Sequence, residues 1–486
     1  MKWVRLLPEA VAEGAGWHMV SAVTADSRSV RPGSLFFALR GTVADGHDYI
    51  ADALSAGAVG VVAERPVETP PEAPVVFHPE ARRLLGEAAA RLQDHPSRDM
   101  AVIGVTGTNG KTTLTWLLAA LLGDGAIIGT LGWGRPGELH PSGETTPDAV
   151  TLQGRLAHLR TEGVAGVAME ASSHALDQDR LAGTTLVGAV WSNLTPEHLD
   201  YHEDLQAYRA AKLRLLERPE LGFAVINADD PEADAFAAVV APDVRLWRYG
   251  LERGDVTLKE AKCGPEGIEM RAATPKGEVT VHSALVGRVN LANLLASVAA
   301  GLALGLSPAR TGQRLSSAAP VPGRMENLGT TPRGAHVWID YAHTADALDR
   351  ALAGAGKLTE GALWCVFGCG GERDTAKRPA MGEVAARHCD RVVLTSDNPR
   401  GEDPEEIIRA IRAGMGDVEP TVIADRGAAI GHALAAADPG DTVIIAGKGH
   451  EREQEIAGRR IPFSDREAVR QWLAYPGEAA GHDESG

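Results

Sequence analysis

Three observations predict an α/β fold with three domains. Short apolar runs alternate with helical stretches along most of the chain, which is the pattern of a mostly parallel sheet covered by helices. The 486 residues are long for one hydrophobic core, and about 150 residues per domain gives three domains. Connections rich in proline or polar residues fall near both predicted boundaries. We therefore expect domains over residues 1–97, 98–324 and 325–486.

Composition argues against several classes of protein. The 44% hydrophobic and 23% charged residues are typical of a globular protein, and 48 Lys plus Arg against 65 Asp plus Glu leave a net charge of −17. This charge argues against a nucleic acid or an anionic membrane as a partner. The four cysteines fit no zinc spacing and are too few for a disulfide scaffold. Since the sequence lacks a signal peptide and a run of about 18 apolar residues, we expect a cytoplasmic protein. We also expect a monomer.

The first domain reads as a small α/β unit. The runs SLFFAL and AVGVVAE predict strands, and YIADALSAGA between them predicts a helix. The stretch TADSRSVRPGSLFFALRGTVADGHDYI gathers Ser, Arg, Gly and Asp around turns, as a pocket for a nucleotide sugar would. These residues are also ordinary turn formers, and taken alone they are better explained that way.

The second domain begins with a phosphate-binding loop in AVIGVTGTNGKTTLTWLLAALL, residues 101–122. A strand, a glycine-rich turn, Gly-Lys-Thr and a helix follow one another, so backbone N–H groups, Lys111 and the helix N-terminus would meet phosphates while the Thr112 hydroxyl meets magnesium. Val105 stands where the usual pattern has glycine, yet this context favours a ligand over a bare tight turn. The nucleotide-binding residues expected here are Thr106, Gly107, Thr108, Asn109, Gly110, Lys111, Thr112 and Thr113.

Polar side chains follow the next predicted strands, VAGVAME, LVGAVWSNL and GFAVINAD. They are Glu170, the segment from Asn193 to His202, and the run NADD at residues 227–230. Ligands of parallel sheets bind at strand C-termini. Each residue alone could instead be a buried cap, but Glu170 and His198 beside a phosphate loop favour a magnesium–nucleotide site.

The third domain repeats the alternation after the Pro/Gly stretch SSAAPVPGR. Its strands are predicted in HVWIDYA, LWCVFGCGG, RVVLTSDNP, PTVIAD and DTVIIAGKG, which indicates a Rossmann-like domain. The turn FGCGGERD lacks the full dinucleotide fingerprint, so bound NAD is not expected.

Eight motifs in one order resemble the Mur ligases of bacterial cell-wall synthesis: TGTNGKTT, MEASSHAL, NLTPEHLDYH, VPGRME, DYAHT, GCGGERD, DNPRGEDP and AGKGHE. The resemblance implies an ATP- and Mg²⁺-dependent, ADP-forming acid–amino-acid ligase of peptidoglycan synthesis, and hence roles in cell shape, cell division and the cell cycle. In this family ATP phosphorylates the C-terminal carboxylate of a UDP-muramoyl peptide, an amine attacks the acyl phosphate, and phosphate leaves. Catalysis then rests on positioning and charge stabilisation.

The resemblance also implies site residues. Those expected to be catalytic are Lys111, Lys212, His198 and Glu170, and those expected at the metal are Thr112, Glu170, His198 and Lys212. Further ATP contacts are expected from Asn290, Asn293, Arg324 and Asp340. Uridine and diphosphate are assigned to Ser27, Thr42, Val43 and Ala44, and the muramoyl peptide to Thr145, Thr146, Ser172, Gln178 and Arg180.

Two of these positions need comment. Lys212 occupies the position of a carbamylated lysine in the family, although its residues alone indicate only a solvated helix lysine. Glu144 departs from the family, which often has Asn before the Thr-Thr pair, and an acid beside an anionic substrate puts that local contact in doubt.

The polar run after RVVLTS is expected to bind the incoming amino acid. The planar fork of Arg400 suits a carboxylate, and a distal carboxylate distinguishes meso-diaminopimelate from lysine or ornithine. Arg400 could equally bind the α-carboxylate, which all three share. The resemblance points to diaminopimelate, because DNPR is associated with members that add it. The residues expected around this substrate are Arg373, Asp397, Asn398, Pro399, Arg400, Gly447 and Glu451.

The expected acceptor is UDP-N-acetylmuramoyl-L-alanyl-D-glutamate, and the alternatives are the same reaction with L-lysine or L-ornithine, or a related amide ligase such as folylpolyglutamate synthase. From another class, a regulatory ATPase would explain the phosphate loop but not the polar clusters of the last domain.

Overall fold

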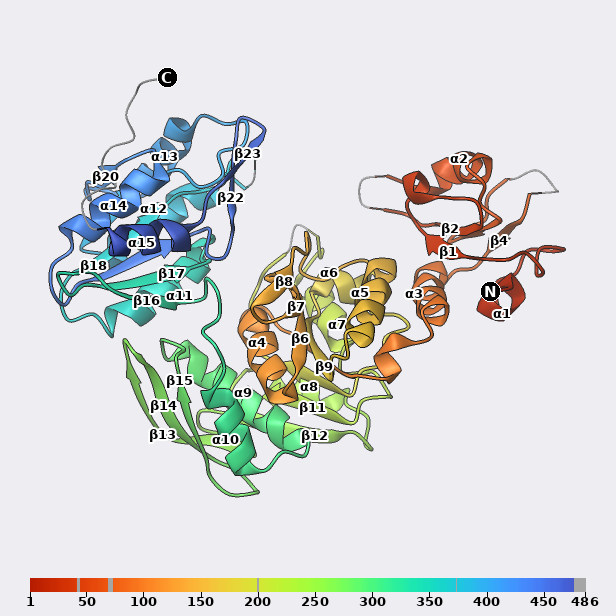
Figure 1. Cartoon of the computed structure of the whole chain (residues 1–486), viewed down its shortest axis with the longest axis horizontal. Coiled ribbons are helices and arrows are strands. Elements are labelled where there is room, and N and C mark those ends of the chain that lie inside the picture. The colour runs from red at the N-terminus through yellow and green to blue at the C-terminus, as the bar shows by residue number, and fades with distance from the viewer. Residues whose placement is uncertain (42–43, 69–72, 199–200, 373, 476–486) are drawn as a thin grey trace. The chain divides into compact units, whose positions relative to one another are not determined.

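The computed structural model describes residues 1–41, 44–68, 73–198, 201–372 and 374–475 (Figure 1). Three expected substrate residues, Thr42, Val43 and Arg373, lie outside the described residues. Sheets of mostly parallel strands covered by helices confirm the predicted α/β class. The described chain forms two compact units, one of Met1–Thr257, Ala273–Gly277 and Asn293–Arg314, and one of Leu258–Ala272, Glu278–Ala292 and the residues from Leu315 onward.

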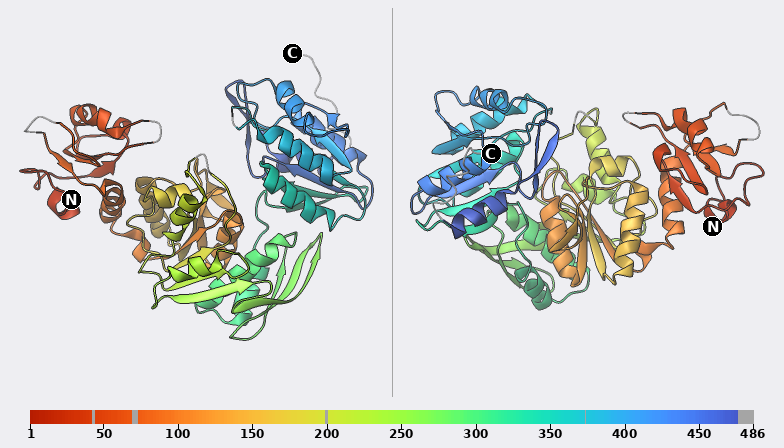
Figure 2. Two further views of the ribbon diagram at one scale, coloured as in Figure 1. Left: turned by 180° about the vertical axis from the view of Figure 1, so that it is seen from behind. Right: turned by 45° about the horizontal axis from the view of Figure 1, so that its top comes forward.

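The first unit begins with four parallel strands in the order β1 (Ala22–Thr24), β2 (Ser34–Ala38), β3 (Gly60–Ala63) and β4 (Val75–Phe77), drawn in red in Figure 2. Phe37 of β2 packs in the core that includes α1 (Trp3–Leu6) and α3 (Ala81–Leu92), whereas Phe36 packs in the core that includes α2 (Ile50–Ser55). Because β2 is buried on both faces, its sequence is apolar without alternation. The two short 3-10 helices of this region are η1 (Ser27–Ser29) and η2 (Gly46–Tyr49).

The larger sheet of the first unit runs in parallel through six strands. Their order is β12 (Arg245–Gly250), β11 (Phe223–Asn227), β10 (Gly188–Trp191), β5 (Ala101–Thr106), β9 (Gly166–Glu170) and β6 (Gly125–Gly129). Two antiparallel strands, β7 (Gly132–Arg135) and β8 (Glu138–His140), extend it beyond β6. The strands predicted before Glu170, Asn193 and Asn227 are thereby confirmed, and their C-terminal ends lie at one edge with that of β5.

Helices join these strands. Helix α4 (Lys111–Leu122) packs on β6 and β9, and the core on one face of the sheet includes α5 (Ala149–Thr161) and α8 (Ala233–Ala238). The remaining helices of this region are η3 (Pro96–Arg98), α6 (Ser173–Asp177), α7 (Leu205–Leu213), α9 (Val289–Ala303) and α10 (Pro308–Ser316). Strand β13 (Val256–Gly264) pairs with the end of β12 and continues into the second unit, where β14 (Gly267–Ala273) and β15 (Val279–Ser283) form an antiparallel pair.

The C-terminal sheet of the second unit has the order β16 (Glu326–Thr330), β17 (His336–Asp340), β21 (Thr442–Ala446), β18 (Leu363–Phe367), β19 (Arg391–Leu394) and β20 (Thr421–Val422). All neighbours are parallel except β16 and β17. One face packs on α11 (Ala345–Gly356), α12 (Lys377–His388) and α13 (Pro404–Arg412), and the other on α14 (Arg426–Ala436) and α15 (Asp465–Ala474). A hairpin of β22 (Glu453–Ile456) and β23 (Arg459–Pro462) follows β21. The predicted strand–helix alternation of this domain is confirmed.

Candidate active site

The glycine-rich turn that the sequence predicts to bind phosphate lies between β5 and α4. Gly107 and Gly110 have φ of +145° and +88°, which only glycine adopts readily. Lys111, at the first position of α4, folds back and its Nζ donates to the carbonyl oxygens of Gly107, at 2.9 Å, and Thr108, at 2.8 Å. The lysine charge is therefore held at the loop.

The segment that follows β10 braces this loop. The Thr108 N–H donates to the Asn193 carbonyl at 3.0 Å, and the Asn109 N–H donates to Asn193 Oδ1 at 2.9 Å. Ser192 Oγ donates to the Asn109 carbonyl at 2.5 Å, and a Cβ on Gly107 would lie only 1.9 Å from that hydroxyl. Asn193, the first residue of the polar segment noted in the sequence, therefore supports the loop.

The loop residues fit a nucleotide phosphate. Asn109 Nδ2 is buried and has no hydrogen-bond partner among the described residues, and a phosphate oxygen is an acceptor that would satisfy it. The N-terminus of α4 offers further N–H donors and a favourable dipole. Asn293 of α9 also lies here, because a Cβ on Gly110 would come within 2.7 Å of its Oδ1. The second expected adenine residue, Asn290, donates its side-chain amide to the Val286 carbonyl at 2.8 Å.

Lys212 reaches the same loop from α7. Its side chain is 1% exposed, and its Nζ donates to the Gly107 carbonyl at 2.8 Å and lies 4.4 Å above the Tyr208 ring. Burial and the nearby charge of Lys111 hold the pKa of Lys212 well below its usual value, against the attraction of Glu197. The solvated helix lysine that the residues alone indicate is therefore wrong, and the side chain is buried.

Glu170 lies at the C-terminal end of β9, paired with Val105 of β5. Its carboxylate is buried and accepts hydrogen bonds from the Thr130 N–H, at 2.8 Å, and the Thr130 hydroxyl, at 3.2 Å. Both donors are neutral, and no cationic side chain among the described residues forms an ion pair with this carboxylate. A divalent cation fits such a carboxylate.

His198 lies beside a histidine that the sequence analysis did not single out. Its backbone has φ of +56°, and its ring meets the ring of His174 of α6 edge-on, with centroids 4.9 Å apart. Within the described ranges, no three His, Cys, Asp or Glu side chains are arranged to hold a metal ion. Magnesium that also binds substrate phosphates needs only one or two protein carboxylates.

The residues expected at the muramoyl peptide form one hydrogen-bonded cluster next to Glu170. Thr146 Oγ1 donates to the Glu170 carbonyl at 2.7 Å and accepts from the Ser172 N–H at 3.1 Å. Arg180 donates to the Thr146 carbonyl and to Gln178 Oε1, and the hydroxyl of Thr145 lies 3.2 Å from that of Thr130. The structure therefore brings together Thr145, Thr146, Ser172, Gln178 and Arg180.

Near the expected uridine diphosphate residues of the N-terminal sheet, the structure shows a hydrogen-bonded pair that the sequence analysis missed. Ser27 lies in η1, and the Ala44 carbonyl accepts from the Gly41 N–H at 2.9 Å. Nearby, Asp45 caps η2 and binds the buried His47, whose backbone and ring hydrogen bonds hold the pKa of Asp45 below its usual value. The Asp-x-His spacing in ADGHDY could have indicated this pair from the sequence.

In the second unit, Arg324 and Asp340 lie close together. Asp340 ends β17, and its carboxylate accepts from the N–H groups of Met325 and Ala342, each at 2.8 Å. Burial raises the pKa of Asp340, although the charge of Arg324 opposes that effect. The Arg324 guanidinium lies 5.0 Å from the Tyr341 ring centroid.

The loops after β19 and β21 lie in contact. Asn398 Nδ2 donates to Glu451 Oε2 at 2.9 Å, and Gly447 has φ of +111° with no room for a Cβ, which would lie 2.6 Å from Asp397 Oδ2. Burial raises the pKa of Asp397. Arg400, which follows Pro399, donates to the Gly371 carbonyl at 2.6 Å.

Lys448 belongs to this cluster and was missed. It is fully buried, and its Nζ donates to Asn398 Oδ1 at 3.0 Å, Glu451 Oε2 at 2.8 Å and the Glu453 carbonyl at 2.7 Å. Burial alone would raise the pKa of Glu451, but Lys448 and Asn398 more than offset it and the pKa is lowered. The motif AGKGHE contained the only signal for this lysine.

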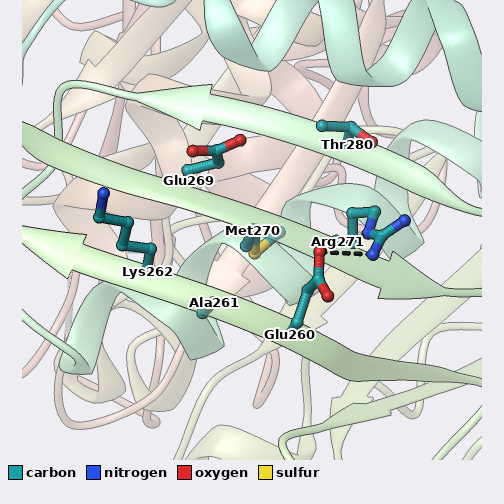
Figure 3. Close-up of a pocket in the computed structure, with 7 residues that line it drawn as sticks. All are labelled: Glu260, Ala261, Lys262, Glu269, Met270, Arg271 and Thr280. Carbon is teal, nitrogen blue, oxygen red and sulfur yellow. Dashed lines mark hydrogen bonds and ion pairs between the residues drawn. The ribbon is translucent and has the colours of Figure 1, made fainter.

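A surface pocket of about 520 Å³ lies elsewhere, across β13, β14 and β15 (Figure 3). The Arg271 and Glu260 side chains pair across the strands at 2.6 Å, as charged residues on a solvated sheet face do. None of the predicted site residues lines it, and we assign it no role.

Comparison with known proteins identifies the family. Family models match in order: the Mur ligase family catalytic domain over residues 19–98, the Mur ligase middle domain over 105–301 and the Mur ligase glutamate ligase domain over 323–449. A relative from Alkalilimnicola ehrlichii, named UDP-N-acetylmuramoyl-L-alanyl-D-glutamate–2,6-diaminopimelate ligase, is 46% identical, covering 93% of this chain and 95% of its own. The chain belongs to the Mur ligase family. This confirms the predicted family, its three α/β domains and an ATP-dependent, ADP-forming ligase of peptidoglycan synthesis.

Other relatives of this Mur ligase bear the same name. One from Chromobacterium violaceum is 46% identical, covering 94% of this chain and 96% of its own. A solved structure is 34% identical with a TM-score of 0.74 and covers 98% of this chain and 99% of its own. These relatives do not favour folylpolyglutamate synthase. Each helix in the described part of this Mur ligase is too short or too polar to cross a membrane.

Proposed function

We propose that this Mur ligase joins meso-diaminopimelate to UDP-N-acetylmuramoyl-L-alanyl-D-glutamate by way of an acyl phosphate, with hydrolysis of ATP to ADP. The observation that carries the proposal is the loop of residues 397–400, whose Asn398 meets Glu451 in a chain 46% identical to relatives named for this reaction. We further propose a cytoplasmic monomer with domains over 1–97, 98–324 and 325–486. A phosphate-release assay tests the reaction: phosphate should appear only when ATP, the UDP-muramoyl dipeptide and the diamino acid are all present.

The phosphate loop is proposed to hold ATP. Magnesium, when bound, would neutralise phosphate charge and supply a Lewis acid beside the transferred phosphoryl group. Glu170 and His198, the Thr112 hydroxyl and a carbamylated Lys212 would hold that ion. Lys111 would bind the β- and γ-phosphates from its position over the Gly107 and Thr108 carbonyls. Asn290, Asn293, Arg324 and Asp340 are proposed further ATP contacts.

The muramoyl peptide is proposed to bind beside Glu170. The support is the cluster of Thr146, Ser172 and Arg180, which is joined to the Glu170 backbone by the Thr146 hydroxyl. A guanidinium at this point suits a carboxylate of the D-glutamyl residue. Ser27, together with residues 42–44, is proposed to hold the uridine diphosphate.

The diamino acid is proposed to bind between the loops after β19 and β21. Glu451 would accept its distal ammonium and Arg400 would bind its distal carboxylate, which lysine and ornithine lack. Arg400 is only 20% exposed in its side chain and lies 3.4 Å from Glu455, so its guanidinium is held in one region of this site. Together, one group of each charge from these two loops would match the zwitterionic distal end of diaminopimelate.

Removing the Arg400 side chain should abolish the preference for diaminopimelate. In wild type, kcat/KM for diaminopimelate should exceed that for lysine or ornithine, and in Arg400→Ala this ratio should fall by about tenfold or more, because a charged hydrogen bond is worth roughly 1.5–3 kcal/mol. Kinetics with the three amino acids measure the ratio. Arg412→Ala, an exposed arginine at the end of α13, is the control and should leave it unchanged. A wild type that prefers lysine or ornithine would overturn the assignment.

Lys448→Gln should weaken binding of the diamino acid selectively. The buried ammonium holds both Asn398 and Glu451, so its loss should raise KM for diaminopimelate about tenfold while KM for ATP changes little. Steady-state kinetics with each substrate varied separately will show whether KM rises for diaminopimelate and not for ATP. The exposed Lys357, at the end of α11, provides the matched control Lys357→Gln. An equal rise in both KM values would indicate general loosening instead.

A further inference from the structure

Glu144, the residue that departs from the family pattern, forms an ion pair with Arg180. Its Oε2 accepts from Arg180 Nη1. The Glu144 side chain is 60% exposed, whereas that of Arg180 is 21% exposed. A carboxylate of the protein is therefore paired with the guanidinium that is proposed to bind a carboxylate of the substrate.

The other donors of Arg180 are almost fully used. Nε and Nη2 donate to Gln178 Oε1 at 3.1 Å and 2.9 Å, and Nη1 donates to the Thr146 carbonyl at 2.8 Å as well as to Glu144. A guanidinium has five N–H donors, so these contacts leave one, on Nη2. A second carboxylate can take Nη1 and Nη2 together only when Glu144 leaves.

Of the two partners, Arg180 is the one that is held in place. Gln178 accepts hydrogen bonds from the Arg180 guanidinium. The Gln178 side chain is itself held in position, because its Nε2 donates to the Tyr201 hydroxyl at 2.9 Å. That hydroxyl donates in turn to Asp177 Oδ2 at 2.9 Å. Displacement would therefore move the exposed Glu144 side chain and leave Arg180 in position.

A second guanidinium lies within electrostatic reach of Glu144. Arg155 of α5 is held by Ser142, whose Oγ accepts from its Nη1 at 2.8 Å and whose carbonyl accepts from its Nη2 at 3.0 Å. Burial lowers the pKa of Arg155, and the charges of Asp148 and Glu144 act against that effect. Arg155 offers the displaced carboxylate a compensating charge.

We propose that Glu144 is a displaceable internal carboxylate, which occupies Arg180 in the free enzyme and is replaced by the D-glutamyl carboxylate that does not react. This inference rests on the proposed function. The exchange keeps the guanidinium paired in both states and excludes small anions from it. Only a ligand that is anchored elsewhere by its nucleotide and sugar competes effectively with the tethered carboxylate.

Isothermal titration of the UDP-muramoyl dipeptide in the absence of ATP tests the exchange. Glu144→Gln should bind more tightly than wild type, by up to about fivefold, since exposed ion pairs contribute roughly 0.2–1 kcal/mol. The matched control Glu138→Gln removes another exposed carboxylate, on β8, and should bind as wild type does. Sodium sulfate, as a probe anion, should compete with the dipeptide at lower concentration in Glu144→Gln than in wild type.

A double-mutant cycle tests whether the effect passes through Arg180. In an Arg180→Gln background, Glu144→Gln should no longer tighten binding. Unchanged or weaker binding by Glu144→Gln alone, or the same tightening in both backgrounds, would overturn the inference while the proposed function stands. If wild type itself does not bind the dipeptide, the proposed function fails and this inference fails with it.

Discussion

Lys111→Ala is expected to lower kcat for ATP-dependent ligation by about 100-fold or more, an effect of the size seen when one electrostatic contact to a transition state is removed. Lys111 Nζ lies over the phosphate loop, hydrogen-bonded to the Gly107 and Thr108 carbonyls. Because this ammonium is held at the loop, its removal would take away a cation that offsets the charge developing on the transferred phosphoryl group. Phosphate release under saturating substrates measures the loss.

The control for this variant is Lys357→Ala, which removes an exposed lysine at the end of α11. It should retain wild-type activity, and circular dichroism should show both variants folded. Near-normal ligation by Lys111→Ala would refute the assignment of the phosphate loop.

Lys212→Ala should also be largely inactive, and small carboxylates such as acetate or formate should restore part of its activity. Burial beside Lys111 lowers the pKa of Lys212, which favours the neutral amine. A neutral amine adds to CO₂ with loss of a proton, and the resulting carbamate is an anion suited to magnesium. The added carboxylate would replace the oxygens of that carbamate.

Two measurements separate this account from a purely structural role. The ¹³C signal of a carbamate should appear in wild type supplied with labelled bicarbonate and be absent in Lys212→Ala. Rescue should depend on the carboxylate and not on chloride at equal ionic strength, although the space left beside Gly107 by the missing Lys212 side chain would be open to either anion. A fully active alanine variant without any carbamate in wild type would remove Lys212 from the active site.

Local sequence determined most of the fold and the centre of the site. The phosphate loop is a run of consecutive residues, so its strand, its two glycines and its lysine specify a conformation without help from distant segments. The same holds for the polar ends of β9 and β19, because apolar runs predict parallel strands and parallel strands end at one edge. The family resemblance then supplied roles for these positions.

Tertiary structure alone decided which side chains meet. Glu144 and Arg180 are 36 residues apart, Asn398 and Lys448 are 50 apart, and neither pair has a sequence pattern that links its members. The residues around Lys212 are those of an ordinary helix, yet Lys212 is buried because α7 turns this position toward the Gly107 carbonyl. Periodicity fixes which residues share a face, but burial, charge compensation and the choice of partner depend on how that face packs against segments far away in the chain.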